Sequence, residues 1–449
     1  MQRNRKDYRV LMGLREIAGF YGNLKQGFDD IGIEATFLNL SYHPFGFTTK
    51  DNPKWANITN LLFSKISRRL QKGLLKAIWM GIICPILSFP IFIYTLFRYD
   101  VYIFGTFSSF LFFLDLPLLK LLKKKVIYVF HGSESRPFYL NGFQFQSTTK
   151  LGLYSALIVT AIQRFVIWYI ELFAYKIVSI PPQSYFNNRS IINSNLVGIP
   201  SGKSERIYSI KARSETHLGR ETHSVKILHA PSKPGPKGSE KIREYICQLK
   251  SQSYEIDYVE ITGRPNHEVI EALCSCDFVI DQLYSDTPMA GFAAEAAALG
   301  KPALVGGYYS HMLTQILAEK DIPPTLFCQP DEVLQNIEAM VSSKELRESL
   351  GKKAEQFIHK SWSVTEVAKR YQMIIDNEYP SYWDYDPAQL DYIHGCGFAE
   401  DRLRSSLRKY LNEFGSVALF LGSKPNLRDR LIELCGKDVC LQDTVTPDI

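Results

Sequence analysis

Residues 280–305, IDQLYSDTPMAGFAAEAAALGKPALV, form the stretch that decides the fold of this chain. Its composition is typical of a strand, a loop, a helix and a second strand in close succession. Asp286 or Thr287 can cap the helix, Pro288 suits its first turn, and Gly300 can end it. The stretch therefore predicts one strand–helix–strand unit.

The expected helix carries two features that point to a ligand. The amides of Met289, Ala290 and Gly291 lie at its positively polarised tip, which is a ready site for an anion. Glu295 is a lone carboxylate among alanines, about 10 Å along the helix from Pro288. A diphosphate at the tip and a sugar hydroxyl at Glu295 would explain both features.

Two segments resemble a known family. GFAAEAAALGKPALV is similar to the nucleotide-sugar segment of GT-B glycosyltransferases of the retaining family 4 type. ILHAPSKPGPKGSEKIREYI, residues 227–246, is similar to the strand, Lys-Gly loop and helix that hold the donor diphosphate in that family. Together with the stretch between them, they cover residues 225–310 continuously.

The resemblance implies an α/β fold in which two Rossmann-like parallel-sheet domains face a cleft. We expect an N-terminal acceptor-side domain at 1–205, a nucleotide-sugar-binding domain at 206–378 and a mainly helical C-terminal extension at 379–449. The polar stretch from Ser201 to Ser224 is typical of a connector. We expect the extension to contain a helix, a short strand, VALFLG, and a second helix.

The resemblance also implies roles for residues of the second domain. Lys237 would pair with a donor phosphate, and Glu295 would hold the ribose. The family usually has an arginine where this chain has Ser232, with Lys233 beside it, and a glutamate where it has Thr287. These departures leave the strength of diphosphate binding and the identity of the donor sugar open.

The N-terminal half shows an alternation of strands and helices, which predicts a parallel sheet with ligands beyond the carboxyl ends of its strands. We expect strands at 8–14, 33–38, 101–105, within 124–133, at 176–180 and at 196–200. The loop after the first strand would approach the donor phosphate through the amides of Gly19 and Gly22. His131 follows the fourth strand, either as a structural histidine or as a cleft residue that contacts the transferred sugar or the acceptor.

Composition limits the other classes of function. The chain has 449 residues, of which 46% are hydrophobic and 13% aromatic, so it is globular with two or three domains. Its formal charge of +6 is modest, and the sequence has no strong block of basic residues, which argues against nucleic-acid binding. The eight cysteines form no CxxC pair or zinc-ligand spacing, and the start is too polar for a signal peptide. We therefore expect a cytoplasmic protein in a reducing setting.

Two hydrophobic stretches raise the question of a membrane. Residues 74–97 contain a single charge, Lys76, and follow a basic run of Lys65, Arg68, Arg69 and Lys72. This stretch is a core helix, an interfacial helix on an anionic bilayer or a spanning helix, although Pro85 and Pro90 would break a span. The second stretch, 153–180, is interrupted by charges and is typical of an amphipathic domain helix.

The sequence thus predicts a transferase that moves a sugar from a nucleotide-sugar donor to a saccharide or lipid-linked acceptor, with retention, in the synthesis of surface polysaccharide or glycoconjugate. No DxD-like metal motif lies in a suitable loop, so we expect no cofactor and no dependence on metal. Lys237 and the helix tip would stabilise the leaving diphosphate. The alternatives are a non-catalytic scaffold of the same fold and a sugar-nucleotide epimerase.

Overall fold

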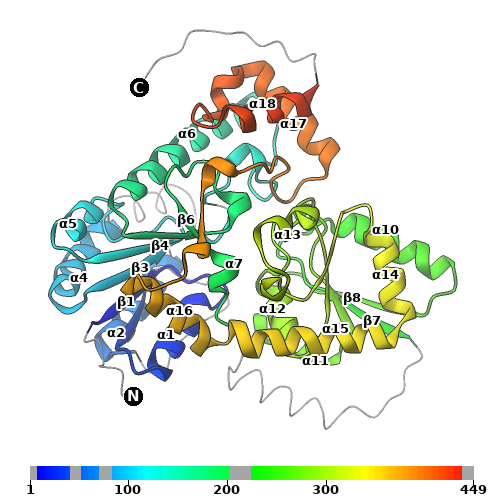
Figure 1. The fold of residues 1–449 in the computed structure, drawn as a ribbon, viewed down its shortest axis with the longest axis horizontal. Helices are drawn as coiled ribbons and strands as arrows, with labels where there is room; N and C mark the ends of the chain where they lie inside the picture. Colours follow the sequence, from blue (N-terminus) through cyan, green and yellow to red (C-terminus); the bar gives the residue numbers. More distant parts are fainter. Residues whose placement is uncertain (1–7, 41–51, 70–82, 133, 202–223, 437–449) are drawn as a thin grey trace.

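The computed structural model describes residues 8–40, 52–69, 83–132, 134–201 and 224–436. Within these ranges the chain forms two parallel-dominant sheets, each with helices on its faces, that lie side by side (Figure 1). The predicted connector lies mostly outside the described residues.

The first sheet has seven strands in the order β12-β6-β5-β4-β3-β1-β2. Its strands are β1 (Val10–Leu14), β2 (Ala35–Asn39), β3 (Val101–Gly105), β4 (Lys125–Val129), β5 (Lys176–Ser179), β6 (Ile191–Asn193) and β12 (Asp384–Tyr385). All neighbours pair in parallel except β12, which runs antiparallel to β6. The strands β1 and β3 are buried along their whole length, as expected for a sheet covered on both faces.

Helices cover both faces of this sheet. They are α1 (Phe20–Asp30), α2 (Lys54–Arg69), α4 (Cys84–Arg98), α5 (Asp115–Leu121), α6 (Lys150–Phe173) and the short α7 (Ser194–Val197). Right-handed crossovers place α1 on one face and the helices that precede β3, β4 and β5 on the other. The second predicted hydrophobic stretch is accordingly a domain helix, α6, whose first turn is capped by the Thr149 hydroxyl.

The second sheet has five strands in the order β11-β10-β9-β7-β8, all parallel. Its strands are β7 (Val225–His229), β8 (Ile256–Glu260), β9 (Phe278–Ile280), β10 (Ala303–Gly306) and β11 (Leu326–Cys328). The surrounding helices are α9 (Pro234–Lys237), α10 (Ser239–Ser251), α11 (Asn266–Ser275), α12 (Gly291–Ala298), α13 (Leu313–Ile316), α14 (Val333–Ser342) and α15 (Lys344–Phe357).

The chain crosses back to the first domain at α16 (Val364–Asp376). Ser363 starts this helix by accepting the amide of Glu366, in the spacing of a capping box. The helix packs on α1 so closely that a Cβ at Gly27 would lie 2.0 Å from the Val364 carbonyl oxygen. A helix within the range expected for the second domain therefore forms part of the first domain's surface (Figure 1).

The C-terminal extension contains α17 (Glu400–Phe414) and α18 (Pro425–Cys435). Its segment before α17 contacts both domains, since the Cys396 carbonyl accepts the Gly142 amide and the Gly397 amide donates to the Tyr284 carbonyl. The extension thus lies across the junction between the two sheets.

Three sequence predictions differ from the structure. The predicted strand at 196–200 is wrong, because the strand lies earlier, at Ile191–Asn193, and α7 occupies Ser194–Val197. The segment VALFLG is a 3-10 helix at Ser416–Leu419, not a strand, because no sheet edge lies beside it to pair with its backbone. Pro90 does not break α4, which continues to Arg98; residues 70–82, with Lys72 and Lys76, lie outside the described part of the chain.

The fold class is confirmed. Two Rossmann-like sheets with helices on their faces, followed by a mainly helical extension, are the architecture that the sequence predicts and that defines a GT-B fold.

Candidate functional site

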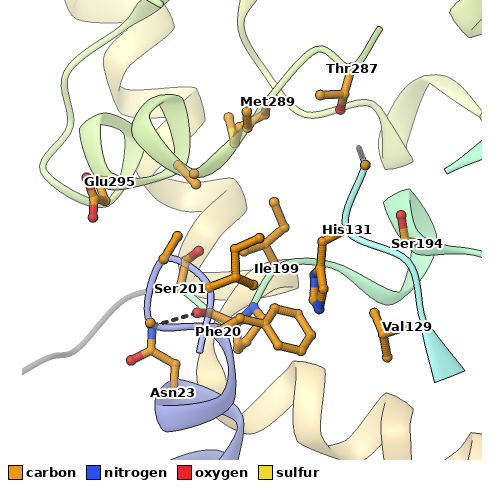
Figure 2. Close-up of a pocket in the computed structure, with 18 of the residues that line it drawn as sticks. Phe20, Asn23, Val129, His131, Ser194, Ile199, Ser201, Thr287, Met289 and Glu295 are labelled. Carbon is orange, nitrogen blue, oxygen red and sulfur yellow. Dashed lines mark hydrogen bonds between the residues drawn. The ribbon is translucent and has the colours of Figure 1, made fainter. Parts of the chain in front are cut away.

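A cavity of about 1220 Å³ lies between the two domains. Its walls come from the loops that follow β1, β4, β7 and β9, so it sits beyond the carboxyl ends of both sheets. Figure 2 shows Met289 and Glu295 on one wall, with Phe20, Asn23 and His131 on the facing one. The cavity is therefore placed where two parallel sheets of this kind bind ligands.

Every residue predicted for the site lies in the wall of this one cavity. From the second domain these are Ser232, Lys237, Met289, Ala290, Gly291 and Glu295, and from the first Gly19, Gly22 and His131. Thr287 lines it as well.

The helix α12 begins later than the sequence predicts. Ala290, in an extended conformation, is its N-cap residue, and neither Asp286 nor Thr287 caps it. The first free amides of the helix are therefore those from Gly291 onward. A Cβ at Gly291 would lie 3.8 Å from the Cβ of Ala18 in the first domain, so the helix tip faces the opposite wall at close range.

Glu295 lies one turn beyond that tip. Asn266 of α11 donates a hydrogen bond of 3.0 Å to Glu295 Oε1. Burial raises the pKa of Glu295 to about 7, and the nearby Asp281 carboxylate adds to this rise while the Asn266 hydrogen bond opposes it. The carboxylate thus changes its charge near neutral pH and can accept hydrogen bonds from hydroxyl groups in its ionised form.

Lys237, at the end of α9, is anchored by a carboxylate that the sequence left without a role. Its Nζ lies 2.6 Å from Oδ1 of Asp281, whose side chain is fully buried. The other oxygen of Asp281, Oδ2, has no hydrogen-bond partner among the described residues. Lys237 is therefore not a free cation, and Asp281 fixes its position and balances its charge.

Lys233 supplies a second cation beside the cavity. Its Nζ donates to the Phe143 carbonyl of the first domain at 2.9 Å, and no carboxylate pairs with it in the described part of the chain. Ser232, next to it, is exposed at the cavity wall. Lys233 thus places a positive charge near the position where the family has its arginine.

His131 has an aromatic environment on the first domain. The ring of Phe20 lies 4.6 Å away, centroid to centroid, and the Tyr21 hydroxyl lies 3.3 Å from Nε2. Burial lowers the pKa of His131 to about 3. The imidazole is therefore neutral at physiological pH, and it can exchange a hydrogen bond with a ligand but cannot supply a positive charge.

The loop with Gly19 and Gly22 differs from its predicted role. Glu16, which is buried, accepts the amides of Ile17, Tyr21 and Gly22 at 2.8, 3.2 and 3.1 Å. The amide of Gly22 is thus occupied by a carboxylate of the same loop. The prediction that it binds the donor phosphate does not hold in this conformation. Burial raises the pKa of Glu16 to about 7, against the effect of the three amide hydrogen bonds.

A buried ion pair joins the two domains beside the cavity. Arg136 Nε donates to Asp286 Oδ2 at 3.0 Å, its Nη2 also contacts that oxygen, and both side chains are almost fully buried. Burial lowers the pKa of Arg136, but the Asp286 carboxylate raises it above its ordinary value overall. Gln183 donates to the same carboxylate at 3.3 Å.

Sequence reasoning missed several of these residues. Arg136, Gln183 and Asn266 contact partners that are far away in the chain, so no local pattern marks them. Glu16 accepts amides one to six residues further along its own loop. The position of Arg136, shortly after the strand that ends at Val129, was the one available signal, since charged side chains at that edge of a sheet face the cleft.

Comparison with known proteins gives structural relatives only. No family model matches the sequence, and no curated protein matches it. The fold is similar to HepE of Anabaena in complex with UDP and glucose, with 12% identity, a TM-score of 0.47, and coverage of 82% of this chain and 99% of that one. It is also similar to the catalytic domain of starch synthase IV of Arabidopsis thaliana bound to ADP and acarbose, with 10% identity, a TM-score of 0.49 and coverage of 83% and 99%.

A third similar structure is UDP-GlcNAc 2-epimerase of Methanocaldococcus jannaschii, with 11% identity, a TM-score of 0.39 and coverage of 78% and 98%. Because the TM-scores of these similar structures are all below 0.5, the fold assignment rests on the strand order and connections of this chain, as described above.

Replacing Arg136 with Met should strongly destabilise the protein. The change leaves the Asp286 carboxylate buried without its cation, which typically costs about 3–5 kcal/mol. The double variant Arg136→Met/Asp286→Leu should recover most of this loss, because it removes the unpaired charge. Chemical denaturation followed by tryptophan fluorescence measures the effect.

The matched control is Lys344→Met, which breaks an ion pair whose side chains are 73% and 68% exposed. An exposed pair of this kind contributes about 0–1 kcal/mol. Equal losses in Arg136→Met and Lys344→Met would contradict a structural role of the interdomain pair.

Proposed function

We propose that the protein is a glycosyltransferase that moves a sugar from a nucleotide-sugar donor to a saccharide or lipid-linked acceptor. One observation carries the proposal. A single interdomain cavity brings together Lys237, Lys233, the tip of α12 and the Glu295 carboxylate one turn further along that helix. A cation and free amides suit a diphosphate, and a carboxylate suits the hydroxyls of a ribose.

The donor would lie along α12. Its diphosphate would contact Lys237, Lys233 and the amides at the helix tip, and its ribose would donate hydrogen bonds to Glu295. Because Asp281 holds the Lys237 ammonium in place, its position is set before the donor binds, which lowers the cost of ordering it. The transferred sugar would then point toward the first domain, where His131 faces the cavity.

We propose that transfer proceeds with retention of the anomeric configuration. The bond between the anomeric carbon and the diphosphate oxygen breaks, and the acceptor hydroxyl forms the new bond on the same face. The proton of that hydroxyl passes to the departing phosphate oxygen. The protein then contributes positioning and stabilisation of the negative charge on the leaving group, from Lys237, Lys233 and the helix tip, and needs no metal.

We further propose that the enzyme acts in the cytoplasm, in the synthesis of surface polysaccharide or glycoconjugate. Two alternatives depend on specific residues. Ser232 and Thr287, which replace charged residues of the family, would fit a scaffold that binds its ligand weakly. An epimerase would convert a nucleotide-sugar without any acceptor.

The proposal is tested by thermal-shift measurement with a panel of UDP-, ADP- and GDP-sugars, followed by an assay for release of the nucleoside diphosphate. We expect one donor class to raise the melting temperature, since a ligand that binds only the folded state stabilises it. We expect release of the diphosphate only after an acceptor is added, and unchanged rates in the presence of EDTA. Conversion of the sugar without acceptor would establish the epimerase, and the absence of any binding would leave the scaffold.

Glu295 should make donor affinity depend on pH. Its ionised form accepts the ribose hydroxyls, and its pKa is raised to about 7, so affinity should rise as the pH increases through about 7 and level off above it. The variant Glu295→Gln should bind more weakly than the wild type above this pH and show a flat profile. Isothermal titration calorimetry measures both effects, with Glu348→Gln on the exposed face of α15 as the control. A pH-dependent profile retained in Glu295→Gln would assign the dependence to another group.

Lys237→Ala should lower turnover by about a hundredfold, which corresponds to the loss of about 3 kcal/mol of charge stabilisation as the diphosphate leaves. The neighbouring Lys241→Ala, whose side chain is half exposed, should remain close to wild type. Because the change also leaves Asp281 unpaired, the double variant Lys237→Ala/Asp281→Asn separates the two effects. If that variant regains both stability and turnover, Lys237 is a structural residue and not a catalytic one.

A further inference from the structure

An apolar stripe runs along the outer side of α6. Its exposed members recur every three or four residues: Leu151, Tyr154, Ile158, Ile162, Phe165, Trp168 and Leu172. Residues at this spacing share one side of a helix. The stripe runs from Leu151 to Leu172, so it extends over about 32 Å of the helix.

The stripe continues onto the neighbouring helix α5. The two helices are joined where Lys120 Nζ donates to the Leu172 carbonyl. The leucines around α5 are also exposed: Leu114, Leu118, Leu121 and Leu122. We call the exposed side chains of these two helices the apolar face. The helices α5 and α6 lie on the outer side of the first domain, with α4 beside α5 (Figure 1). Phe89 and Phe97 of α4 are exposed as well. Monomeric soluble proteins rarely expose continuous apolar patches of this extent.

The three helices that carry or border the apolar face have no exposed carboxylate of their own. The helices α4, α5 and α6 contain only two carboxylates, Asp115 and Glu171, and both are buried. Exposed lysines lie at opposite ends of the face, Lys123 and Lys150. The nearby half-exposed carboxylates Glu34 and Asp100 are paired with Arg98 and Lys124. An apolar surface with exposed lysines at its ends and no exposed carboxylate on its own helices is complementary to a bilayer that contains anionic lipids.

The inner side of α6 is bonded to the rest of the first domain, which argues against a helix that crosses a membrane. Within the described residues, α6 is the helix long and apolar enough to cross a membrane, by length and composition. Its buried side, however, carries Gln163, which donates to the Arg136 carbonyl, and Glu171, which accepts the amides of Asn188 and Arg189. A spanning α6 would lose these contacts and expose Glu171 to lipid, which is costly.

We propose that the apolar face docks the protein on an anionic bilayer, with α6 parallel to the membrane plane and its stripe inserted at the interface. The loop that leads into α6 includes Phe143 and Gln144, which line the interdomain cavity. Docking therefore places the acceptor side of the cavity near the lipid surface. That this delivers a lipid-linked acceptor rests on the proposed function, whereas docking itself does not.

Flotation with vesicles of phosphatidylcholine, alone or mixed with phosphatidylglycerol, tests the proposal on the full chain. We expect binding to the anionic vesicles that weakens as salt is raised, and little binding to the neutral ones. The triple variant Ile162→Ser/Phe165→Ser/Trp168→Ser should bind at least about a hundredfold more weakly, since three large apolar side chains no longer insert. Lys120→Glu/Lys123→Glu should weaken binding chiefly at low salt.

The matched controls change similar residues elsewhere. Tyr382, which is 64% exposed and close to Arg370 of α16, is replaced with Ser, and the exposed Lys352 of α15 is replaced with Glu. Both should bind vesicles as the wild type does, and all variants should keep its melting temperature. Equal binding by the triple variant overturns the proposal. So does a dimer in solution that the triple variant abolishes, because the face would then belong to a second copy of the chain, or membrane extraction that succeeds only with detergent, because α6 would then span.

Because vesicle binding requires no substrate, the outcome is independent of the transferase assay. If the protein floats with vesicles but releases no nucleoside diphosphate, the docking proposal holds and the proposed transferase function is wrong. If the protein releases nucleoside diphosphate in the presence of an acceptor but does not float with vesicles, the transferase function holds and the docking proposal is wrong.

Discussion

The buried ion pair between Arg136 and Asp286 sets the relation between the two domains, and the cavity depends on that relation. Each partner follows the carboxyl end of a strand, β4 in one sheet and β9 in the other. Their attraction in a nearly water-free setting holds these two edges face to face, and Gln183 adds a third contact to the same carboxylate. The walls of the cavity are the loops that this pair brings together, and a weaker link would leave their separation unspecified.

Other contacts across the junction act in the same direction. The helix α16 leaves the second domain and packs on α1, and the segment at Cys396–Gly397 hydrogen-bonds to backbone groups of both domains. Lys233 of the second domain also donates to Phe143 of the first. Domain closure in enzymes of this architecture excludes water and completes the site. In this structure Lys233 and Cys396, which form two of these interdomain contacts, line the cavity.

The cavity combines fixed and adjustable charges. Lys237 and Arg136 are balanced by buried carboxylates, so their positions are set by the protein. Glu16 and Glu295, on opposite walls, have pKa values raised by burial to about 7. A change of pH around neutrality therefore alters the charge of both walls. Glu16 already accepts the amides at the start of α1, a position that suits an anion, so a phosphate at that helix would have to replace an internal carboxylate.

The sequence by itself determined most of the sheet strands, the α12 segment and part of the cavity lining. Alternating apolar strands, glycines such as Gly300 and the small residues around Glu295 are local signals, because backbone conformation and helix packing act over a few residues. Nine predicted site residues accordingly line one cavity. Only the tertiary structure decided which groups meet in and beside the cavity. Lys237 pairs with Asp281, the Gly22 amide donates to Glu16, and Arg136 pairs with Asp286. Such pairings join residues up to 150 positions apart, and burial then shifts their charges, so neither partner nor charge is written in the local sequence.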